Sequence, residues 1–222
     1  MSKFENAKVL VKQGWLQGYT EGHVKIFKGI PYAAPPVGER RFKHPEEPGK
    51  WRGVRKAINY AAASIQHVMS DEEMPANVHG VPQFMMPSQY EEDCIYLNVW
   101  TPAKTEEDKL PVFIWIHGGG MVAGSGCEVV CDGIGFAKRK DIIVVTINYR
   151  LGFYGFFCHP ELTEEGNGTC GNYALYDTRM ACKWVKENIA KFGGDPDRIT
   201  VAGQSGGAAG TGDLNAYPLL KD

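Results

Sequence analysis

Residues 199–207 read Ile-Thr-Val-Ala-Gly-Gln-Ser-Gly-Gly, and this stretch decides the predicted fold of the 222-residue chain. Four residues typical of a strand run into a G-x-S-x-G pattern around Ser205. To present a serine at the tip of a sheet, the chain must turn from strand to helix within about one residue, which strains the backbone. Glycine at positions 203 and 207 removes side chains that would clash there. The pattern predicts such a strained turn, although it also fits an ordinary glycine-rich loop.

A second motif lies upstream, where the apolar run 110–116 ends in His117-Gly118-Gly119-Gly120. Three glycines let backbone N–H groups approach a substrate carbonyl, which is how esterases and lipases build an oxyanion hole. Alone, this motif also fits a plain strand-to-loop turn. The two motifs in this order, each after a strand of buried type, predict the site of a serine hydrolase.

Composition and charge exclude several classes of protein. The chain is 43% hydrophobic and 23% charged, which is typical of a soluble globular protein. Its formal net charge of −2 gives no reason to expect nucleic acid or a membrane surface as a partner. No segment has the roughly 18 uninterrupted apolar residues of a membrane helix. Residues 1–6 lack the apolar core of a signal peptide, so we expect a cytoplasmic protein.

The cysteines give no pattern of metal ligands. Cys127 and Cys131 are four residues apart, but no second pair of ligands lies near them in the sequence, so we disfavour a zinc site. In a cytoplasmic chain we expect reduced, mostly buried thiols. The six cysteines are Cys94, Cys127, Cys131, Cys158, Cys170 and Cys182.

Hydrophobic periodicity predicts a mixed α/β organisation. Apolar and polar residues alternate around glycines over 8–32, which predicts short antiparallel strands and hairpins. Three prolines, at positions 31, 35 and 36, predict an extended surface loop over 27–42. Residues 43–92 show few periodic signals and read mainly as loops, with 69–90 as one long loop. Further strands are expected at 93–100, 111–116, 142–148 and from 199, and helices at 132–140 and 172–192. Strand, helix and strand in succession indicate a βαβ unit with parallel strands.

Several short blocks stand out beside the two motifs above: GIPYA (29–33), PPVG (35–38), RF (41–42), EDCIYLNV (92–99), WIHGGG (115–120), NYRLG (148–152) and FGGDP (192–196). With these blocks, the chain closely resembles the type-B carboxylesterases, the branch of the α/β-hydrolases that includes the cholinesterases. The similarity runs from about residue 24 to 218.

The resemblance implies an α/β-hydrolase fold: a mostly parallel central sheet preceded by N-terminal antiparallel strands, with residues 1–222 as the N-terminal part of one carboxylesterase domain. It implies that Ser205 is acylated, that the N–H groups of Gly119, Gly120 and Gly206 form the oxyanion hole, and that no cofactor or metal is needed. The expected substrate is a small-molecule carboxylic ester. The resemblance also implies two structural ion pairs, Arg41–Glu92 and Arg150–Asp177.

The sequence departs from the family pattern at three positions. Gln204 and Gly206 stand where the family usually has glutamate and alanine. Ser64 stands where many relatives have a cysteine that pairs with the one at position 94, so that disulfide cannot form.

No triad acid or base is evident in this chain. The fold orders its triad as serine, acid and then histidine, but no histidine follows Ser205, and Asp213 and Asp222 lie too close to it in sequence. We therefore expect the acid and histidine in a missing C-terminal half, and this chain to be inactive alone. Chain order disfavours each local histidine as the base: His23, His44, His67, His79, His117 and His159.

Two further expectations follow. The alternative to a hydrolase is a catalytically silent, esterase-like fragment or binding protein. The strand that leads to Ser205 should be central in the sheet, so its missing neighbours would leave an apolar edge exposed. We expect a C-terminal half, or self-association, to cover that edge.

Overall fold

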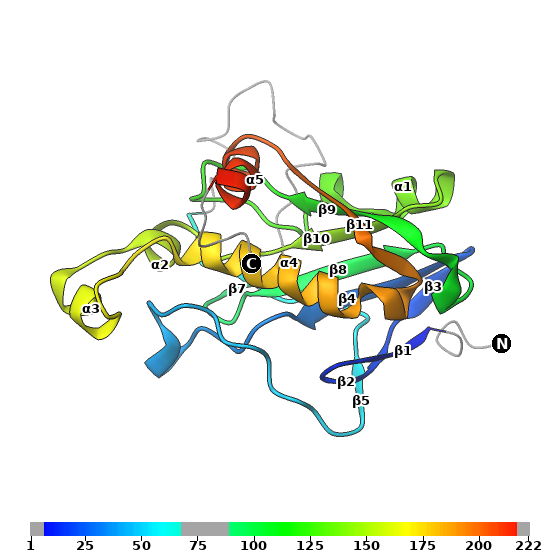
Figure 1. Cartoon of the computed structure of the whole chain (residues 1–222), viewed down its shortest axis with the longest axis horizontal. Helices are drawn as coiled ribbons and strands as arrows, with labels where there is room; N and C mark the ends of the chain where they lie inside the picture. Colours follow the sequence, from blue (N-terminus) through cyan, green and yellow to red (C-terminus); the bar gives the residue numbers. More distant parts are fainter. Residues whose placement is uncertain (1–6, 68–88, 217–222) are drawn as a thin grey trace.

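The computed structural model describes residues 7–67 and 89–216, which are built around a six-stranded sheet (Figure 1). The order of the strands in this sheet is β11-β9-β10-β8-β4-β3. β9 runs parallel to both β10 and β11, whereas β8, β4 and β3 pair antiparallel with their neighbours. The strands are β3 (Tyr19–Glu21), β4 (Val24–Pro31), β8 (Tyr96–Thr101), β9 (Leu110–Ile116), β10 (Ile143–Ile147) and β11 (Gly194–Gly203).

Two small sheets accompany the large one. The first has the order β1-β2-β5, and the second pairs β6 with β7. Their strands are β1 (Lys8–Val11), β2 (Gly14–Gln17), β5 (Val54–Lys56), β6 (Ala63–Ser64) and β7 (Tyr90–Glu91). The antiparallel pairs β1–β2 and β3–β4 confirm the hairpins predicted for residues 8–32.

The helices complete the α/β arrangement. They are α1 (Ile134–Arg139), α2 (Gly152–Phe156), α3 (Pro160–Glu165), α4 (Tyr173–Asn188) and α5 (Gly206–Ala216). Short 3-10 turns are η1 (Gly38–Arg40), η3 (Glu106–Asp108), η4 (Val129–Cys131) and η5 (Ile189–Phe192). The helix predicted over 172–192 is confirmed as α4 followed by η5. α2 and α3 were not predicted, because five or six residues are too few to show helical periodicity.

The sheet has an apolar core on each face. Successive strand residues point to opposite faces. Phe27 and Val145 belong to the large cluster that includes Trp184 of α4, whereas Ile26 and Val144 belong to a smaller cluster with Ala137 of α1. In Figure 1, α4 lies along one face of the sheet. This layering confirms the predicted α/β-hydrolase class of fold, in which the parallel part comprises β10, β9 and β11.

The prediction of a loop over 27–42 was wrong for residues 27–31, whereas residues 32–42 form neither strand nor α-helix and contain only the short turn η1. β4 continues to Pro31, and its last residues are buried in the core. The register between β4 and β8 shifts between Phe27 and Ile30, and an irregularity of this kind tolerates a proline. Gly29 has a φ of 68° there and donates its N–H to the side chain of Asn98, at 3.0 Å.

Both implied ion pairs are present, and they differ in burial. Arg150 holds Asp177 through two side-chain bonds of 2.8 Å each, and both side chains are buried. Arg41 reaches Glu92 at 2.8 Å, but the Arg41 side chain is 44% exposed. The buried pair fixes the end of β10 to α4, because Arg150 follows β10 in the chain and Asp177 belongs to α4.

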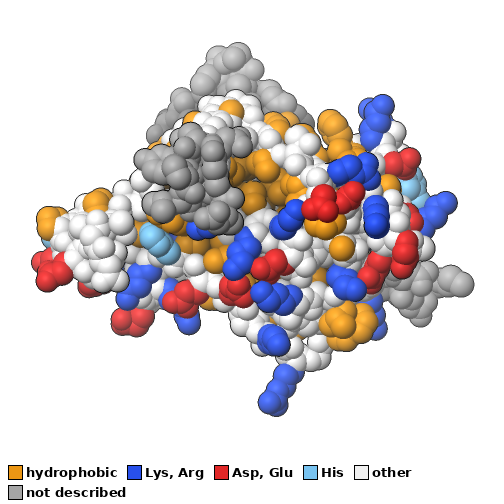
Figure 2. Space-filling model, in the orientation of Figure 1, with side chains coloured by type: hydrophobic (Ala, Val, Ile, Leu, Met, Phe, Trp, Pro, Cys, Tyr) orange, Lys and Arg blue, Asp and Glu red, His pale blue; other side chains and the backbone are white. Residues whose placement is uncertain are grey.

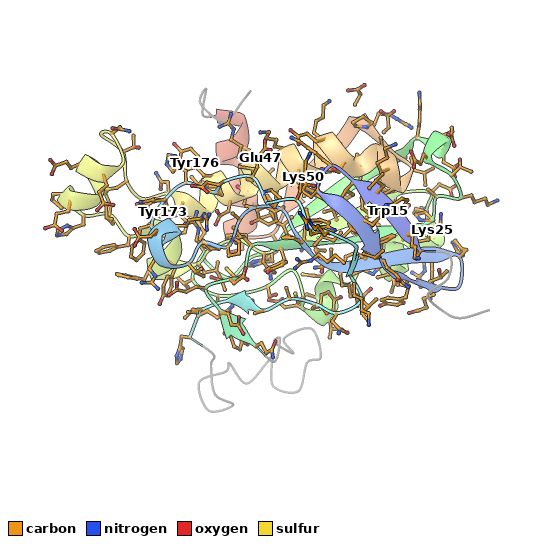
Figure 3. All side chains as sticks on the ribbon, turned by 90° about the horizontal axis from the view of Figure 1, so that it is seen from below. Trp15, Lys25, Glu47, Lys50, Tyr173 and Tyr176 are labelled. Atoms are coloured by element: carbon orange, nitrogen blue, oxygen red, sulfur yellow. A yellow bond between two sulfur atoms is a disulfide. The ribbon has the colours of Figure 1, made fainter. Side chains whose placement is uncertain are left out.

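The segment after η1 crosses α4. Figure 3 shows Tyr173 and Tyr176 on α4 near this segment, which carries Glu47. The ring of His44 stacks on Tyr176 with 3.8 Å between centroids, and Glu47 pairs with Lys183 of α4 at 2.6 Å. This part of the predicted loop region 43–92 is therefore tied to the helix, whereas the predicted loop 69–90 lies mostly outside the described residues.

The expectation of reduced thiols was wrong for one pair. A disulfide joins Cys158 and Cys170, whose Cα atoms are 5.2 Å apart. The disulfide closes the segment between these cysteines, which contains α3. Sequence spacing alone cannot show that a chain turns back on itself within twelve residues. The other four cysteines are free.

One edge of the large sheet is formed by β11. Among the described strands, β11 pairs with β9 alone, and its Ile199 and Val201 are partly buried against the core. Figure 2 shows hydrophobic side chains in the region where Figure 1 places β9 and β11. That further strands or a second copy cover this edge stays a prediction. Within residues 7–67 and 89–216, no helix is both long and apolar enough to cross a membrane.

Candidate active site

Ser205 occupies the turn that joins β11 to α5. Its φ is 53°, a left-handed conformation that is rare for a residue with a side chain, and Ser205 is exposed. The strained turn predicted from the sequence is thus present. Because α5 begins at Gly206, its free N–H groups lie directly after the serine, where they favour negative charge.

The glycines beside Ser205 are required by close backbone contacts. A side chain at Gly203 would overlap the carbonyl of Gly207, and one at Gly207 would overlap the carbonyl oxygen of Ile116. The turn therefore packs against itself and against the end of β9. This is the crowding that the sequence predicted for these positions.

The loop that follows β9 carries the two glycines predicted to donate to the oxyanion. Gly119 and Gly120 have φ values of 103° and 61°, and the Gly119 carbonyl accepts N–H bonds from Val122 and Ala123 at 3.1 and 3.0 Å. Within the described chain, no hydrogen bond is assigned to the N–H groups of Gly119 and Gly120. That these two N–H groups donate to an oxyanion stays a prediction.

Gly206 packs closely against this glycine loop. A Cβ at Gly206 would lie 3.3 Å from the nitrogen of Gly120 and 3.0 Å from that of Met121. The residue after Ser205 therefore sits beside the glycine loop, and the structure brings together all four residues predicted for the site: Ser205, Gly119, Gly120 and Gly206.

His117 is a structural part of the glycine loop. Its ring is buried, its Nδ1–H donates to the carbonyl of Gly118 at 2.8 Å, and the ring stacks on Tyr149 with 4.4 Å between centroids. Burial lowers the pKa of His117 to about 4. The imidazole is therefore neutral near pH 7, and its Nδ1 is already engaged by the loop.

The other described histidines have separate surroundings. His159 caps α3 by accepting the N–H of Glu161 at 3.4 Å, His44 stacks on Tyr176, and His23 is exposed at the turn between β3 and β4. His79 lies outside the described residues. His67 is exposed just before the 68–88 gap in the described residues.

Two polar side chains that support the loop were missed by the sequence analysis. The amide of Gln66 accepts the N–H of Gly124 at 2.7 Å and donates to its carbonyl at 3.0 Å, as a paired strand would. Asn148 accepts from the N–H of Gly126 at 2.9 Å and donates to the carbonyl of Ala62 at 3.2 Å. Asn148 ends the predicted strand 142–148, but no role at the site was predicted for it; its position directly after β10 was the available signal.

Ser64 lies at the place where the sequence departs from the disulfide pattern of the family. It is buried, and its hydroxyl accepts the N–H of Leu151 at 3.0 Å. Burial raises the pKa of Cys94 to about 12, so its thiol stays protonated. Burial also raises the pKa of Cys131 to about 12, which does not favour a thiolate ligand for a metal.

The chain matches the model of the carboxylesterase family over residues 5–219. It is 43% identical over 209 residues to a fumonisin B1 esterase of Sphingopyxis macrogoltabida, and 42% identical over 213 residues to a para-nitrobenzyl esterase of Bacillus subtilis. These matches cover 94% and 96% of this chain but only 36% and 41% of the two relatives.

Solved structures agree with the sequence matches. The crystal structure of a carboxylesterase from Geobacillus stearothermophilus is similar with a TM-score of 0.83 at 42% identity, over 97% of this chain and 42% of that one. A solved PNB esterase has a TM-score of 0.82 at 38% identity, over the same share of each chain. This chain therefore spans about two fifths of the length of the relatives that it matches.

Proposed function

Because this chain belongs to the carboxylesterase family, we propose that it carries the nucleophile and oxyanion hole of a serine hydrolase of carboxylic esters. The observation that supports this most is the meeting of two motifs. Ser205 has left-handed backbone angles at the tip of β11, and the residue after it lies beside the nitrogen of Gly120.

The proposed reaction has two halves. The Oγ of Ser205 attacks the ester carbonyl as a histidine takes its proton, and the oxyanion that forms is held by the N–H groups of Gly119, Gly120 and Gly206. The C–O bond to the alcohol then breaks, and the alcohol leaves with the proton from the histidine. Water attacks the acyl-serine in the same way, releasing the carboxylic acid and regenerating Ser205.

The base and the acid of the triad are proposed to lie outside this sequence. In this fold both follow the serine along the chain, and the chain spans only 36% and 41% of two esterase relatives. Of the local histidines, His117 is the one in the glycine loop, and its Nδ1 bond to Gly118 and its low pKa suit a structural role. By itself this chain is expected to be inactive.

The test is to replace the nucleophile in the complete protein. Ser205→Ala should lower kcat/KM toward p-nitrophenyl butyrate by at least about 10⁴-fold, because no acyl-enzyme can form. Lys8→Ala is a suitable control, since Lys8 is exposed on β1, which belongs to a separate small sheet. Near-wild-type hydrolysis by Ser205→Ala would overturn the proposed function.

A further inference from the structure

The small sheet β1-β2-β5 carries a row of exposed apolar side chains. Antiparallel pairing places Leu10 opposite Trp15, and parallel pairing places Val54 beside Trp15 on its other side. Leu10, Trp15 and Val54 are 47%, 45% and 46% exposed, respectively. Because side chains alternate between the two faces of a strand, the neighbouring residues Val9 and Leu16 point inward and belong to the large core cluster. The row therefore lies on the outer face of this sheet.

This row is one continuous patch. Residues that are paired directly across strands have Cβ atoms about 5 Å apart, so the three side chains are immediate neighbours. They are three of the ten large apolar residues that are exposed in the described chain. Apolar side chains gathered in this way mark a surface that meets a partner, whereas single exposed ones need no explanation.

The segment before β5 is bound to the same part of the sheet. The indole N–H of Trp51 donates to the backbone carbonyl of Trp15 at 2.9 Å, and the backbone N–H of Trp51 donates to the carbonyl of Gln13 at 3.0 Å. These two bonds hold residues 50–52 against the start of β2. They also place Lys50 and Arg52, the neighbours of Trp51, close to the apolar row; Figure 3 shows Trp15 and Lys50 from below.

Exposed cations flank the row. Lys56 lies on the same face of β5 as Val54, because residues two positions apart on a strand point to the same side. Lys50, Arg52 and Lys56 are all exposed, and within residues 7–67 and 89–216 none of the three is joined in an ion pair. These charges are therefore free to attract an anionic partner.

The local charge of this region differs from that of the whole chain. Residues 7–17 and 49–56, which contain β1, β2 and β5, hold six lysines and arginines and no aspartate or glutamate, whereas the chain has a net charge of −2. Lys12 pairs with Glu47 at 3.2 Å and with Glu187 at 3.0 Å, and Glu47 also pairs with Lys183. The carboxylates bound to this region are thus already matched by cations.

An apolar row with a cationic rim complements the surface of an anionic bilayer. Tryptophan favours the depth of the lipid head groups, and lysine and arginine are attracted to anionic lipids. Nucleic acid or an acidic protein would also attract the cations, but the row itself offers them one polar side-chain group, the indole N–H of Trp15. The apolar centre of this face therefore favours lipid.

We propose that the outer face of the β1-β2-β5 sheet binds the surface of a lipid bilayer that contains anionic head groups. Trp15 enters the head-group layer, and Lys50, Arg52 and Lys56 contact the anionic lipids. This proposal differs from the expectation that the net charge suggested, because attraction to a surface depends on the charge of the face that meets it. None of these residues belongs to the candidate active site.

The test measures binding of the complete protein to vesicles by sedimentation. One set of vesicles contains phosphatidylcholine alone, and the other contains about 30% phosphatidylglycerol. Each lysine or arginine near an anionic surface strengthens binding by about fivefold, so the anionic vesicles should bind at least about tenfold more tightly than the neutral ones. Raising the salt concentration from about 0.05 to 0.5 M should weaken this binding at least about fivefold.

Two variants separate the apolar row from the charges. Trp15→Ser should weaken binding to the anionic vesicles by about tenfold, because it removes the centre of the row. Lys56→Glu replaces a cation with an anion and should weaken the same binding by about 25-fold. Hydrolysis of a soluble ester should stay unchanged in both variants, and a thermal melt shows that each is folded.

Matched controls lie on the opposite side of the large sheet. Phe136 is 60% exposed on α1, and Lys140 is exposed directly after α1. In Figure 1, α1 lies above the large sheet, whereas β1, β2 and β5 lie below it. Phe136→Ser and Lys140→Glu should bind the anionic vesicles as the wild type does.

Three results would overturn the proposal. The first is equal binding, or no binding, to the two kinds of vesicle. The second is binding of soluble polyglutamate or heparin as tight as that of the vesicles and unchanged in Trp15→Ser, which would assign the face to an anionic polymer. The third is a dimer in solution that Trp15→Ser converts to a monomer while vesicle binding is absent, since a second copy would then cover the row.

Discussion

The ring of Tyr149 stacks on the ring of His117, and the hydroxyl of Tyr149 donates to the backbone carbonyl of the same histidine at 2.9 Å. Tyr149 follows β10 and His117 follows β9, so this contact joins the ends of two parallel strands just where the glycine loop begins. A neutral histidine suits this packing, because its Nδ1–H also holds the carbonyl of Gly118. The proposed oxyanion hole is therefore supported by a buried aromatic pair.

The buried His117 predicts a dependence of stability on pH. Its pKa in the folded protein is about 4, below the usual value of 6.5, because burial disfavours the charged ring. As the pH falls from about 6.5 to about 4, the unfolded chain binds a proton that the folded chain does not, so the free energy of unfolding decreases. The loss from this group should approach about 3 kcal/mol and then stop near pH 4.

Urea unfolding of the wild type and of His117→Gln at several pH values checks this prediction. The variant should lose less stability than the wild type between pH 6.5 and 4. His23→Gln, at an exposed position, should follow the wild-type curve. Parallel curves for the wild type and His117→Gln would show that His117 is not buried as described.

Because the Arg150–Asp177 ion pair is buried, neutralising one partner should strongly lower the free energy of unfolding. Asp177→Asn should lower the free energy of unfolding by about 3–5 kcal/mol, because it leaves the charge of Arg150 buried without its partner. The exposed pair Lys186–Asp197 is the control, since Asp197 is 84% exposed, and Asp197→Asn should cost less than about 1 kcal/mol. Equal losses in the two variants, measured by urea unfolding, would contradict the difference in burial.

Two glycines of α5 predict effects of opposite sign. Gly207→Ala should cost about 1–3 kcal/mol or more, because its Cβ would overlap the backbone of Ile116. In the described part of the chain, nothing lies within 4 Å of a Cβ at Gly212, so Gly212→Ala should stabilise the protein by about 1 kcal/mol through helix propensity. Melting temperatures that shift in the same direction for both variants would argue against this packing of the turn.

The disulfide predicts the number of reactive thiols. In denaturant without reductant, an alkylating reagent should modify four cysteines, Cys94, Cys127, Cys131 and Cys182. After reduction it should modify all six. Mass spectrometry of the alkylated protein reads both numbers directly, and six modified cysteines without reduction would show that Cys158 and Cys170 are not joined.

The sequence predicted the parts of this molecule that have strong local signals. The strands β9, β10 and β11 and the helix α4 follow from hydrophobic periodicity, and the turn at Ser205 follows from the spacing of its glycines. The extension of β4 through Gly29 and Pro31 was not predicted, because an irregular register and a long-range bond to Asn98 override the local preference of proline.

Long-range contacts account for what the sequence missed at the site. The support from Gln66 and Asn148 depends on bonds to residues 58 and 22 positions away, respectively, in the glycine-loop region. No spacing pattern in a single sequence shows that residues so far apart come into contact.

We propose that Ser205 is an activated nucleophile in the complete protein. The most direct measurement is reaction with a fluorophosphonate, which modifies activated serines, followed by peptide mapping. We expect one adduct per molecule, on the peptide that contains Ser205, and no adduct in Ser205→Ala. A complete, folded protein that stays unmodified, or that is modified at another serine, would contradict it.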